Sequence, residues 1–140
     1  MSLQLNAYLS FTDNTRQAME FYKSVFGGEL TMQTYKEGGM PEGPDNDKIM
    51  HAVLNGDNGI TFFASDTPSD GQHTTGSSIS MALSGDIDAE KTLTGYWNKL
   101  GEGGTITMPL ETAPWGDKFG MVTDKFGINW MVDIAPNKES

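Results

Sequence analysis

The sequence predicts an α+β fold of two tandem βαβββ modules that form a cupped mixed sheet. Segments with the two-residue period of half-buried strands alternate with two amphipathic helical segments, and the order strand, helix, strand, strand, strand occurs twice. The two halves also match each other at a constant spacing. The 140 residues suit one domain, residues 1–140, with module one at 4–65, a linker at 66–76 and module two at 77–135.

The first module opens with an alternating strand from Leu5 to Phe11. A helix should follow, because Asn14 and Gln17 have capping-box spacing and Gly27 stands where a helix ends. Its apolar stripe comprises Ala18, Phe21, Tyr22, Val25 and Phe26. Three more strands are expected at 29–36, 48–55 and 59–65, with turn residues between the last two that predict a hairpin. Residues 37–47 should form an irregular loop that could lie over a cleft or serve only as a connection.

The second module repeats this order. A strand is expected at 77–84, and Asp86 or Asp88 can cap a helix that stops at Gly101. Three further strands should occupy 103–108, 116–123 and 127–134. An offset of 74 residues pairs core positions of the two modules: Leu9 with Leu83, Met19 with Leu93, Tyr22 with Tyr96, Phe26 with Leu100, and Gly27 with Gly101. We favour duplication over chance as the source of these matches, because they fall on core positions of the same elements in the same order. The two sheets of a duplicated unit can curve toward each other to enclose a cleft.

Composition excludes several classes of function. A net charge of -10 would repel a phosphate backbone, so nucleic acid is not an expected partner. No apolar run reaches the ~20 residues of a membrane span, and the N-terminus lacks a signal-peptide pattern, so we expect a cytoplasmic protein without a membrane partner. Cysteine is absent, which rules out disulfides and thiolate sites. Hydrolase, nucleotide-binding and zinc-protease motifs are also missing from the sequence.

Three segments resemble one known family: YLSF at 8–11, FYKSVFGGEL at 21–30 and WGDKFGMVTDKFGINW at 115–130. Together they are similar to the glyoxalase/bleomycin-resistance/extradiol-dioxygenase (vicinal oxygen chelate) superfamily, and within it to the PhnB-like group, sometimes labelled demethylubiquinone methyltransferase-like. The resemblance covers nearly the whole chain. Lys125 departs from it, since the family usually has proline there. The resemblance implies the glyoxalase-like fold and a homodimer.

Metal enzymes of this superfamily hold a divalent ion with four His, Glu or Gln side chains, two from each module. The resemblance maps these positions onto Asn6, Ser80, Met131 and, with a one-residue ambiguity, Phe62 or Phe63. These residues supply neither an anionic oxygen nor a ring nitrogen, so they cannot jointly hold a hard divalent cation. We therefore expect no metal and no other cofactor.

Two residues are further site candidates. His51 could project into the cleft as a catalytic acid or base, or it could be a half-buried strand histidine that a neighbour satisfies. Trp115 stands beside Pro114 and Gly116 outside a clear strand, so we expect it to line the cleft. The expected ligand-binding set is Trp115, Asn6, Ser80, Phe62, Phe63 and Met131. The second histidine, His73, is expected to be exposed and idle.

Two functions remain open, beside a third interpretation as a purely structural interaction module, which would require no pocket. The missing ligands favour a protein that binds a small organic molecule in the cleft without a metal, as bleomycin-resistance proteins sequester their ligands. The alternative is a lyase, isomerase or dioxygenase of the same superfamily that uses a metal at other positions or depends on His51. The methyltransferase label finds no support, because no strand-loop-helix glycine motif for S-adenosylmethionine is present.

Overall fold

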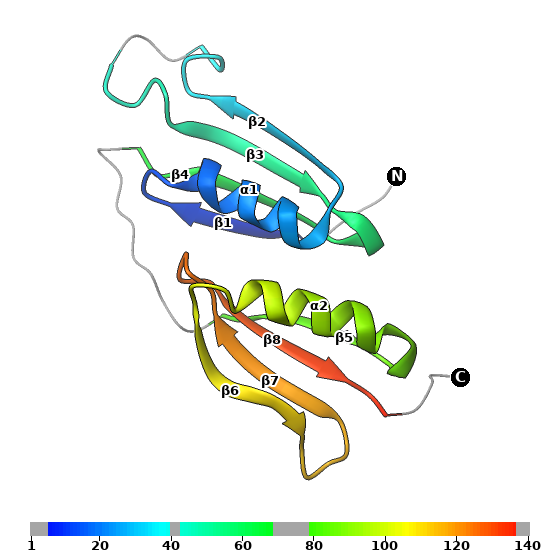
Figure 1. The fold of residues 1–140 in the computed structure, drawn as a ribbon. Coiled ribbons are helices and arrows are strands. Elements are labelled where there is room, and N and C mark those ends of the chain that lie inside the picture. Colours follow the sequence, from blue (N-terminus) through cyan, green and yellow to red (C-terminus); the bar gives the residue numbers. More distant parts are fainter. Residues whose placement is uncertain (1–5, 40–42, 69–78, 137–140) are drawn as a thin grey trace. The chain divides into compact units, whose positions relative to one another are not determined.

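The computed structural model describes residues 6–39, 43–68 and 79–136, and it confirms the βαβββ order in both halves (Figure 1). The chain divides into two compact units, Met1–Thr74 and Thr75–Ser140. Residues 69–76 of the predicted linker, including His73, lie outside the described residues. No helix in the described part of the chain combines the length and the apolar character that crossing a membrane requires.

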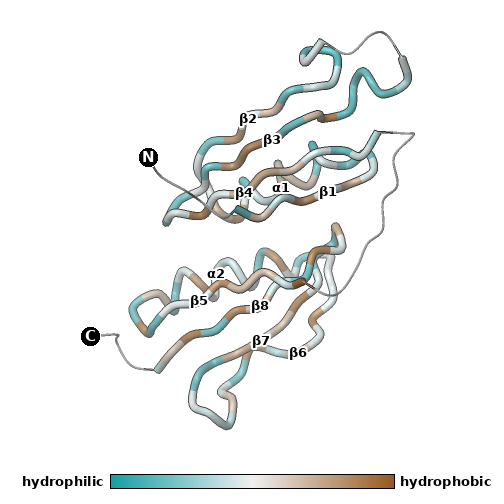
Figure 2. Tube along the Cα trace, turned by 180° about the vertical axis from the view of Figure 1, so that it is seen from behind, coloured by the Kyte–Doolittle hydropathy of each residue, from teal (hydrophilic) through white to brown (hydrophobic). Residues whose placement is uncertain are grey.

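The first unit is a four-stranded sheet with one helix on one of its faces. Its elements are β1 (Ala7–Phe11), α1 (Thr15–Phe26), β2 (Glu29–Thr34), β3 (Ile49–Asn55) and β4 (Thr61–Asp66). The strand order is β1-β4-β3-β2, with β1 parallel to β4 and the other pairs antiparallel. Figure 2 shows the apolar run along β3. Alternate strand residues pack under α1, and the buried ones are Leu9, Phe11, Ala52, Leu54, Phe62 and Ala64.

The start of α1 differs from the prediction. Asn14 forms no side-chain capping hydrogen bond, so the predicted capping box is wrong. Asp66, at the end of β4, takes its place: its Oδ1 accepts hydrogen bonds from the Thr15 backbone nitrogen at 3.0 Å and from Thr15 Oγ1 at 2.7 Å. Its Oδ2 accepts from the Ile49 nitrogen at 2.8 Å. A carboxylate 51 residues away in sequence thus supplies the cap that local spacing suggested.

The predicted hairpin between β3 and β4 is confirmed. The two strands pair antiparallel, and a short 3-10 turn at Asp57–Gly59 joins them. Asn58 adopts the left-handed conformation with φ 61°, which asparagine tolerates better than most residues. The described part of 37–47 forms turns rather than a strand or helix.

The second unit has the same topology. It consists of β5 (Met81–Gly85), a 3-10 turn η2 (Ile87–Ala89), α2 (Glu90–Leu100), β6 (Thr105–Thr112), β7 (Lys118–Thr123) and β8 (Asn129–Ile134), in the sheet order β5-β8-β7-β6. Asp86 accepts a hydrogen bond from the Asp88 nitrogen at 2.9 Å and so caps η2, whereas α2 itself begins after Ala89 without a side-chain capping bond. The strand β6 continues to Thr112, beyond the predicted end at 108, and passes through Pro109. It can do so because β6 is an edge strand, where proline costs no ladder hydrogen bond.

Close packing of β7 against α2 and a hydrogen-bonded turn between β7 and β8 fix the positions of these two strands. A Cβ atom on Gly120 would lie 2.7 Å from the Trp97 ring, so only glycine lets β7 approach the helix this closely. Asp124 is buried and accepts hydrogen bonds from Trp130 Nε1 at 2.8 Å and from the Phe126 nitrogen at 2.8 Å. These bonds close the turn between β7 and β8 and hold the indole of Trp130 in the core.

Candidate functional site

Each sheet has one face under its helix and one face turned away from it, which we call the open face. Burial alternates along the central strands, so the open face of the first unit carries Tyr8, His51, Val53, Phe63 and Ser65. The open face of the second unit carries Ala82, Phe119, Met121, Met131 and Asp133. Side chains on these faces are free of the packing against the helices, and they are therefore the candidates for ligand contact.

Three aromatic side chains meet on the open face of the first unit. Tyr8 and Phe63 are direct partners in the β1–β4 register, and their ring centroids lie 6.3 Å apart. His51 completes the cluster, with its ring 6.2 Å from that of Tyr8 and 5.6 Å from that of Phe63. Asn6, two residues before Tyr8, is half-buried. The structure thus places His51 beside Phe63, on the face that α1 leaves uncovered.

The register and the burial show which of Phe62 and Phe63 lies on the open face. Phe62 is 3% exposed and its ring lies 5.4 Å from that of Tyr22 in the core beneath α1. In the second unit Met81 pairs with Trp130, as Ala7 pairs with Phe62 in the first. Phe62 is therefore the structural counterpart of the buried Trp130, and Phe63 is the counterpart of Met131.

Met131 lies at the centre of the open face of the second unit. It pairs with Ala82 on one side and with Met121 on the other. Ser80, which directly precedes β5, is exposed. Each unit therefore contributes two of the four predicted positions. Asn6 and Phe63 belong to the first unit, and Ser80 and Met131 belong to the second. The predicted cleft between the modules stays a prediction.

These four positions do not fit a divalent cation. The phenyl ring of Phe63 has no donor atom, Met131 offers only a soft thioether, and the serine and asparagine oxygens are neutral. The described residues also contain no group of three or more His, Asp or Glu side chains placed to hold a metal ion. We derive no chemical step through a metal at these positions.

Trp115 lies in the loop between β6 and β7 and is 64% exposed. Its ring stands edge to face against Phe119, with centroids 5.7 Å apart. Both rings line a cavity of about 240 Å³ together with Met108, Pro109, Glu111, Thr112, Ala113 and Pro114. Sequence reasoning identified Trp115 but missed Glu111 and Phe119. The strand β6 was predicted to end at 108, and that boundary hid the pairing of Glu111 with Phe119.

Carboxyl groups surround Phe119 on this face. Glu111 of β6 and Asp133 of β8 are its partners on either side in the sheet register. Burial, followed by a hydrogen bond with Asp117 and the charge of Asp117, raises the pKa of Asp133. Asp133 Oδ1 is buried and has no hydrogen-bond partner among the described residues. The open face of the second unit is thus acidic and aromatic at one end.

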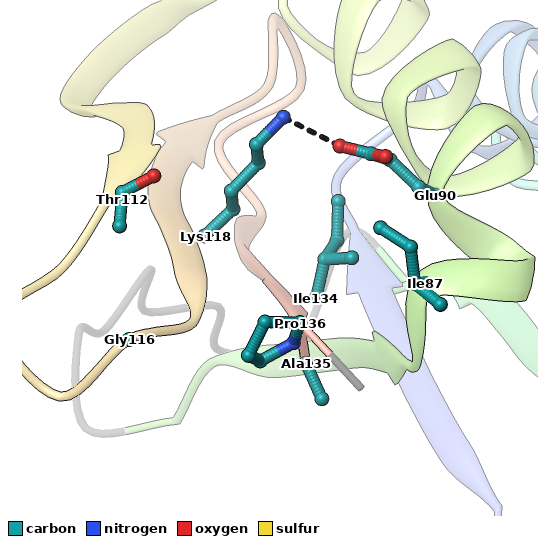
Figure 3. A pocket seen from close by; sticks show the side chains of 8 residues that line it. All are labelled: Ile87, Glu90, Thr112, Gly116, Lys118, Ile134, Ala135 and Pro136. Atoms are coloured by element: carbon teal, nitrogen blue, oxygen red, sulfur yellow. Dashed lines mark hydrogen bonds and ion pairs between the residues drawn. The ribbon is translucent and has the colours of Figure 1, made fainter. Parts of the chain in front are cut away.

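A second cavity of about 210 Å³ lies at the other side of β7, against α2 (Figure 3). Apolar side chains of Ile87, Ile134 and Pro136 form part of its wall. Lys118 Nζ crosses it to Glu90 Oε2 at 2.5 Å, so the two charges of this cavity neutralise each other. The cavity near Trp115 differs in this respect, because its carboxylate has no such partner among the described residues.

Comparisons with known proteins agree on one family. The model of the Glyoxalase/Bleomycin resistance protein/Dioxygenase superfamily matches residues 4–132. Protein YjdN of Escherichia coli is 27% identical over 95% of this chain and 96% of its own length. The crystal structure of PA1353 from Pseudomonas aeruginosa superposes with a TM-score of 0.82 at 37% identity, covering 97% of this chain and all of that one. A PhnB protein from Bacillus cereus follows with a TM-score of 0.71 at 26% identity, over 95% of this chain and all of its own.

Proposed function

Since the chain belongs to the Glyoxalase/Bleomycin resistance protein/Dioxygenase superfamily, we propose that it binds a small, partly apolar organic molecule at the open faces of its sheets, without a catalytic metal. We place it in the PhnB-like group of that superfamily. The WGD and D-x-F-G-x-x-W motifs at 115–130 and the likeness to the Bacillus cereus PhnB protein support this placement.

One observation carries the proposal. Phe63 and Met131, onto which the family resemblance maps the last-strand ligand positions of the superfamily's metal enzymes, both lie on open faces among other apolar or aromatic side chains. Apolar surface of this kind is unfavourable in contact with water. Covering it with an apolar ligand therefore contributes favourably to the free energy of binding. Asn6, Ser80 and His51 supply the few polar groups that would orient that ligand.

His51 supports a second candidate, a metal-free catalyst. The imidazole is half-buried on the open face beside the Tyr8 ring, so a bound molecule could reach one of its nitrogens. Histidine is suited to moving a proton near neutral pH. If His51 acts in this way, the protein is an enzyme of this superfamily rather than a binding protein.

Binding can be tested before the ligand is identified. We expect native mass spectrometry of the purified protein to reveal a co-purified organic molecule, and two-dimensional NMR with a fragment library to shift signals of Tyr8, His51 and Phe63. Replacing Phe63 with alanine should weaken the best fragment roughly 10-fold, whereas Phe21→Ala, on the helix, should not. Fragments that perturb only residues outside the open faces would contradict the proposal.

The metal-free part is tested separately. Calorimetry with Mn²⁺, Zn²⁺ and Ni²⁺ should show no binding at micromolar affinity, because the donor set is unsuitable. Stoichiometric metal that is lost in His51→Ala would restore the metalloenzyme alternative. His51→Ala with an active substrate, once one is known, decides between binding and catalysis.

We also propose that the protein is cytoplasmic and that it forms a homodimer. The family resemblance implies the homodimer. Light scattering at micromolar concentration checks the assembly: a mass near twice 15.2 kDa is expected, and a mass of 15.2 kDa would contradict it.

A further inference from the structure

We propose that the cavity beside Trp115 selects an organic cation, a small molecule that joins an aromatic or aliphatic body to a protonated amine. This inference rests on the proposed function and names the chemical class of the ligand. It concerns the second unit alone, and every residue involved belongs to the hairpin of β6 and β7 or to the neighbouring β8.

The shape and lining of the cavity come first. Its volume of about 240 Å³ suits a small molecule, and two aromatic rings, Trp115 and Phe119, form one wall. Met108 adds a polarizable side chain that is 45% exposed. Aromatic faces attract cations through their quadrupole, most strongly in the case of tryptophan, and thioethers adapt to irregular apolar groups.

The charges around the cavity predict which ligands it prefers. Glu111 lines the cavity, and its carboxylate forms neither an ion pair nor a side-chain hydrogen bond in the described part of the chain. Its cross-strand partner Phe119 is flanked on the other side by Asp133. Among the residues that the structure describes, no lysine or arginine lines this cavity. An anion would therefore be repelled, and a neutral ligand would leave the Glu111 carboxylate without a counter-charge.

The cavity of Figure 3 provides the contrast. It is of similar volume, about 210 Å³, and it too has a carboxylate in its wall, but Lys118 already pairs with Glu90 there. A cationic ligand would have to break that pair. These two cavities thus differ in whether their carboxylate is available, and of the two, the one beside Trp115 combines an aromatic wall with an available negative charge.

Three probes of nearly equal size test the proposal: 2-phenylethylamine, 2-phenylethanol and phenylacetate. They present a cation, a neutral group and an anion on the same ring. NMR titration of the full-length protein should show the amine shifting the Trp115 indole signal and binding roughly 10-fold tighter than the alcohol, with phenylacetate weakest. Glu111→Gln should reduce amine affinity about 5-fold and leave the alcohol unchanged.

Glu102→Gln is the matched control. Glu102 is exposed, lies in the turn after α2 outside the cavity, and its loss changes the net charge by the same amount. If both variants weaken the amine equally, general charge attraction explains the binding and the inference fails. It also fails if amine and alcohol bind alike, in which case the proposed function stands. If no probe perturbs Trp115, the cavity is not the cation site, and the proposed function then depends on the fragments bound beside His51 and Phe63.

Discussion

The two units have the same topology, but their open faces differ in chemistry. In the first unit His51 pairs with Gln33 on the edge strand and lies in an aromatic cluster. In the second unit the equivalent strand position is Phe119, between Glu111 and Asp133. The first face therefore has an imidazole among aromatic rings, and the second has carboxylates on both sides of a phenyl ring. The helix-covered faces, by contrast, are apolar in both units, because they must pack.

The two units therefore share what the core requires and differ in the side chains outside it. Each unit has a buried carboxylate near its last strand, yet the two serve different purposes. Asp66 begins α1 and holds the first residue of β3, whereas Asp124 closes the β7–β8 turn and binds the Trp130 indole. Matching topology therefore does not imply matching polar contacts. Three variants test how far the comparison holds.

The largest effect is expected from Asp66→Ala in the first unit. It removes the acceptor for three hydrogen bonds from buried donors, two from Thr15 and one from the Ile49 nitrogen. We expect the free energy of unfolding to fall by roughly 3 kcal/mol, since each orphaned donor keeps its desolvation cost. Urea denaturation followed by circular dichroism measures this. The exposed Asp47→Ala should change stability by less than about 0.5 kcal/mol, and equal effects would refute the role of Asp66.

A smaller difference in stability is expected between alanine variants of Gly27 and Gly101, two glycines that the 74-residue offset pairs with each other. Gly27 has φ 71°, and a Cβ there would lie close to the Asp57 carboxylate, whereas Gly101 has φ −76° with its nearest neighbour 3.4 Å away. We expect Gly27→Ala to destabilise by roughly 2 kcal/mol and Gly101→Ala to be neutral or slightly stabilising. Paired thermal melts would decide the matter. Similar losses of stability in the two variants would show that both helix ends require glycine to the same extent.

The smallest effect concerns the acidic open face. Because the pKa of Asp133 is raised in the folded state, the native protein binds more protons than the unfolded chain between the ordinary and the raised value. Stability should therefore fall as the pH rises through that window, and stay lower above it. Asp133→Asn should stabilise the protein at pH 7 by roughly 0.5 kcal/mol, as relief of a like-charge pair does.

The control for Asp133→Asn is a second measurement of its effect on stability at low pH. The gain should disappear below the ordinary carboxyl pKa, where both proteins are neutral at this position. Urea denaturation at about pH 7 and about pH 3.5 compares the two conditions. A gain of the same size at both pH values would mean that packing, and not charge, limits stability at this position.

The candidate site was predictable only in part. Trp115, His51, Phe63 and Met131 were found because family motifs and strand alternation mark them. Phe62 was retained as an alternative to Phe63 because one residue of register decides which face a side chain occupies, and a motif alone does not supply that register. Glu111 and Phe119 were missed for a related reason: β6 runs to Thr112, past its predicted end at 108, through a proline that an edge strand accepts.

The sequence by itself determined the order of elements, the internal repeat and the family, since apolar periodicity and turn residues are local and are read along the chain. It also predicted, through the family resemblance, that the four metal positions are occupied by residues unsuited to hold a divalent ion, because residue identity decides donor chemistry. Only the tertiary structure decided that Asp66 starts α1, that Asp124 holds Trp130, and that Glu111, Phe119 and Asp133 form one row. These contacts join residues far apart in sequence, and their partners are set by strand register and by the burial that register creates, which no local pattern encodes.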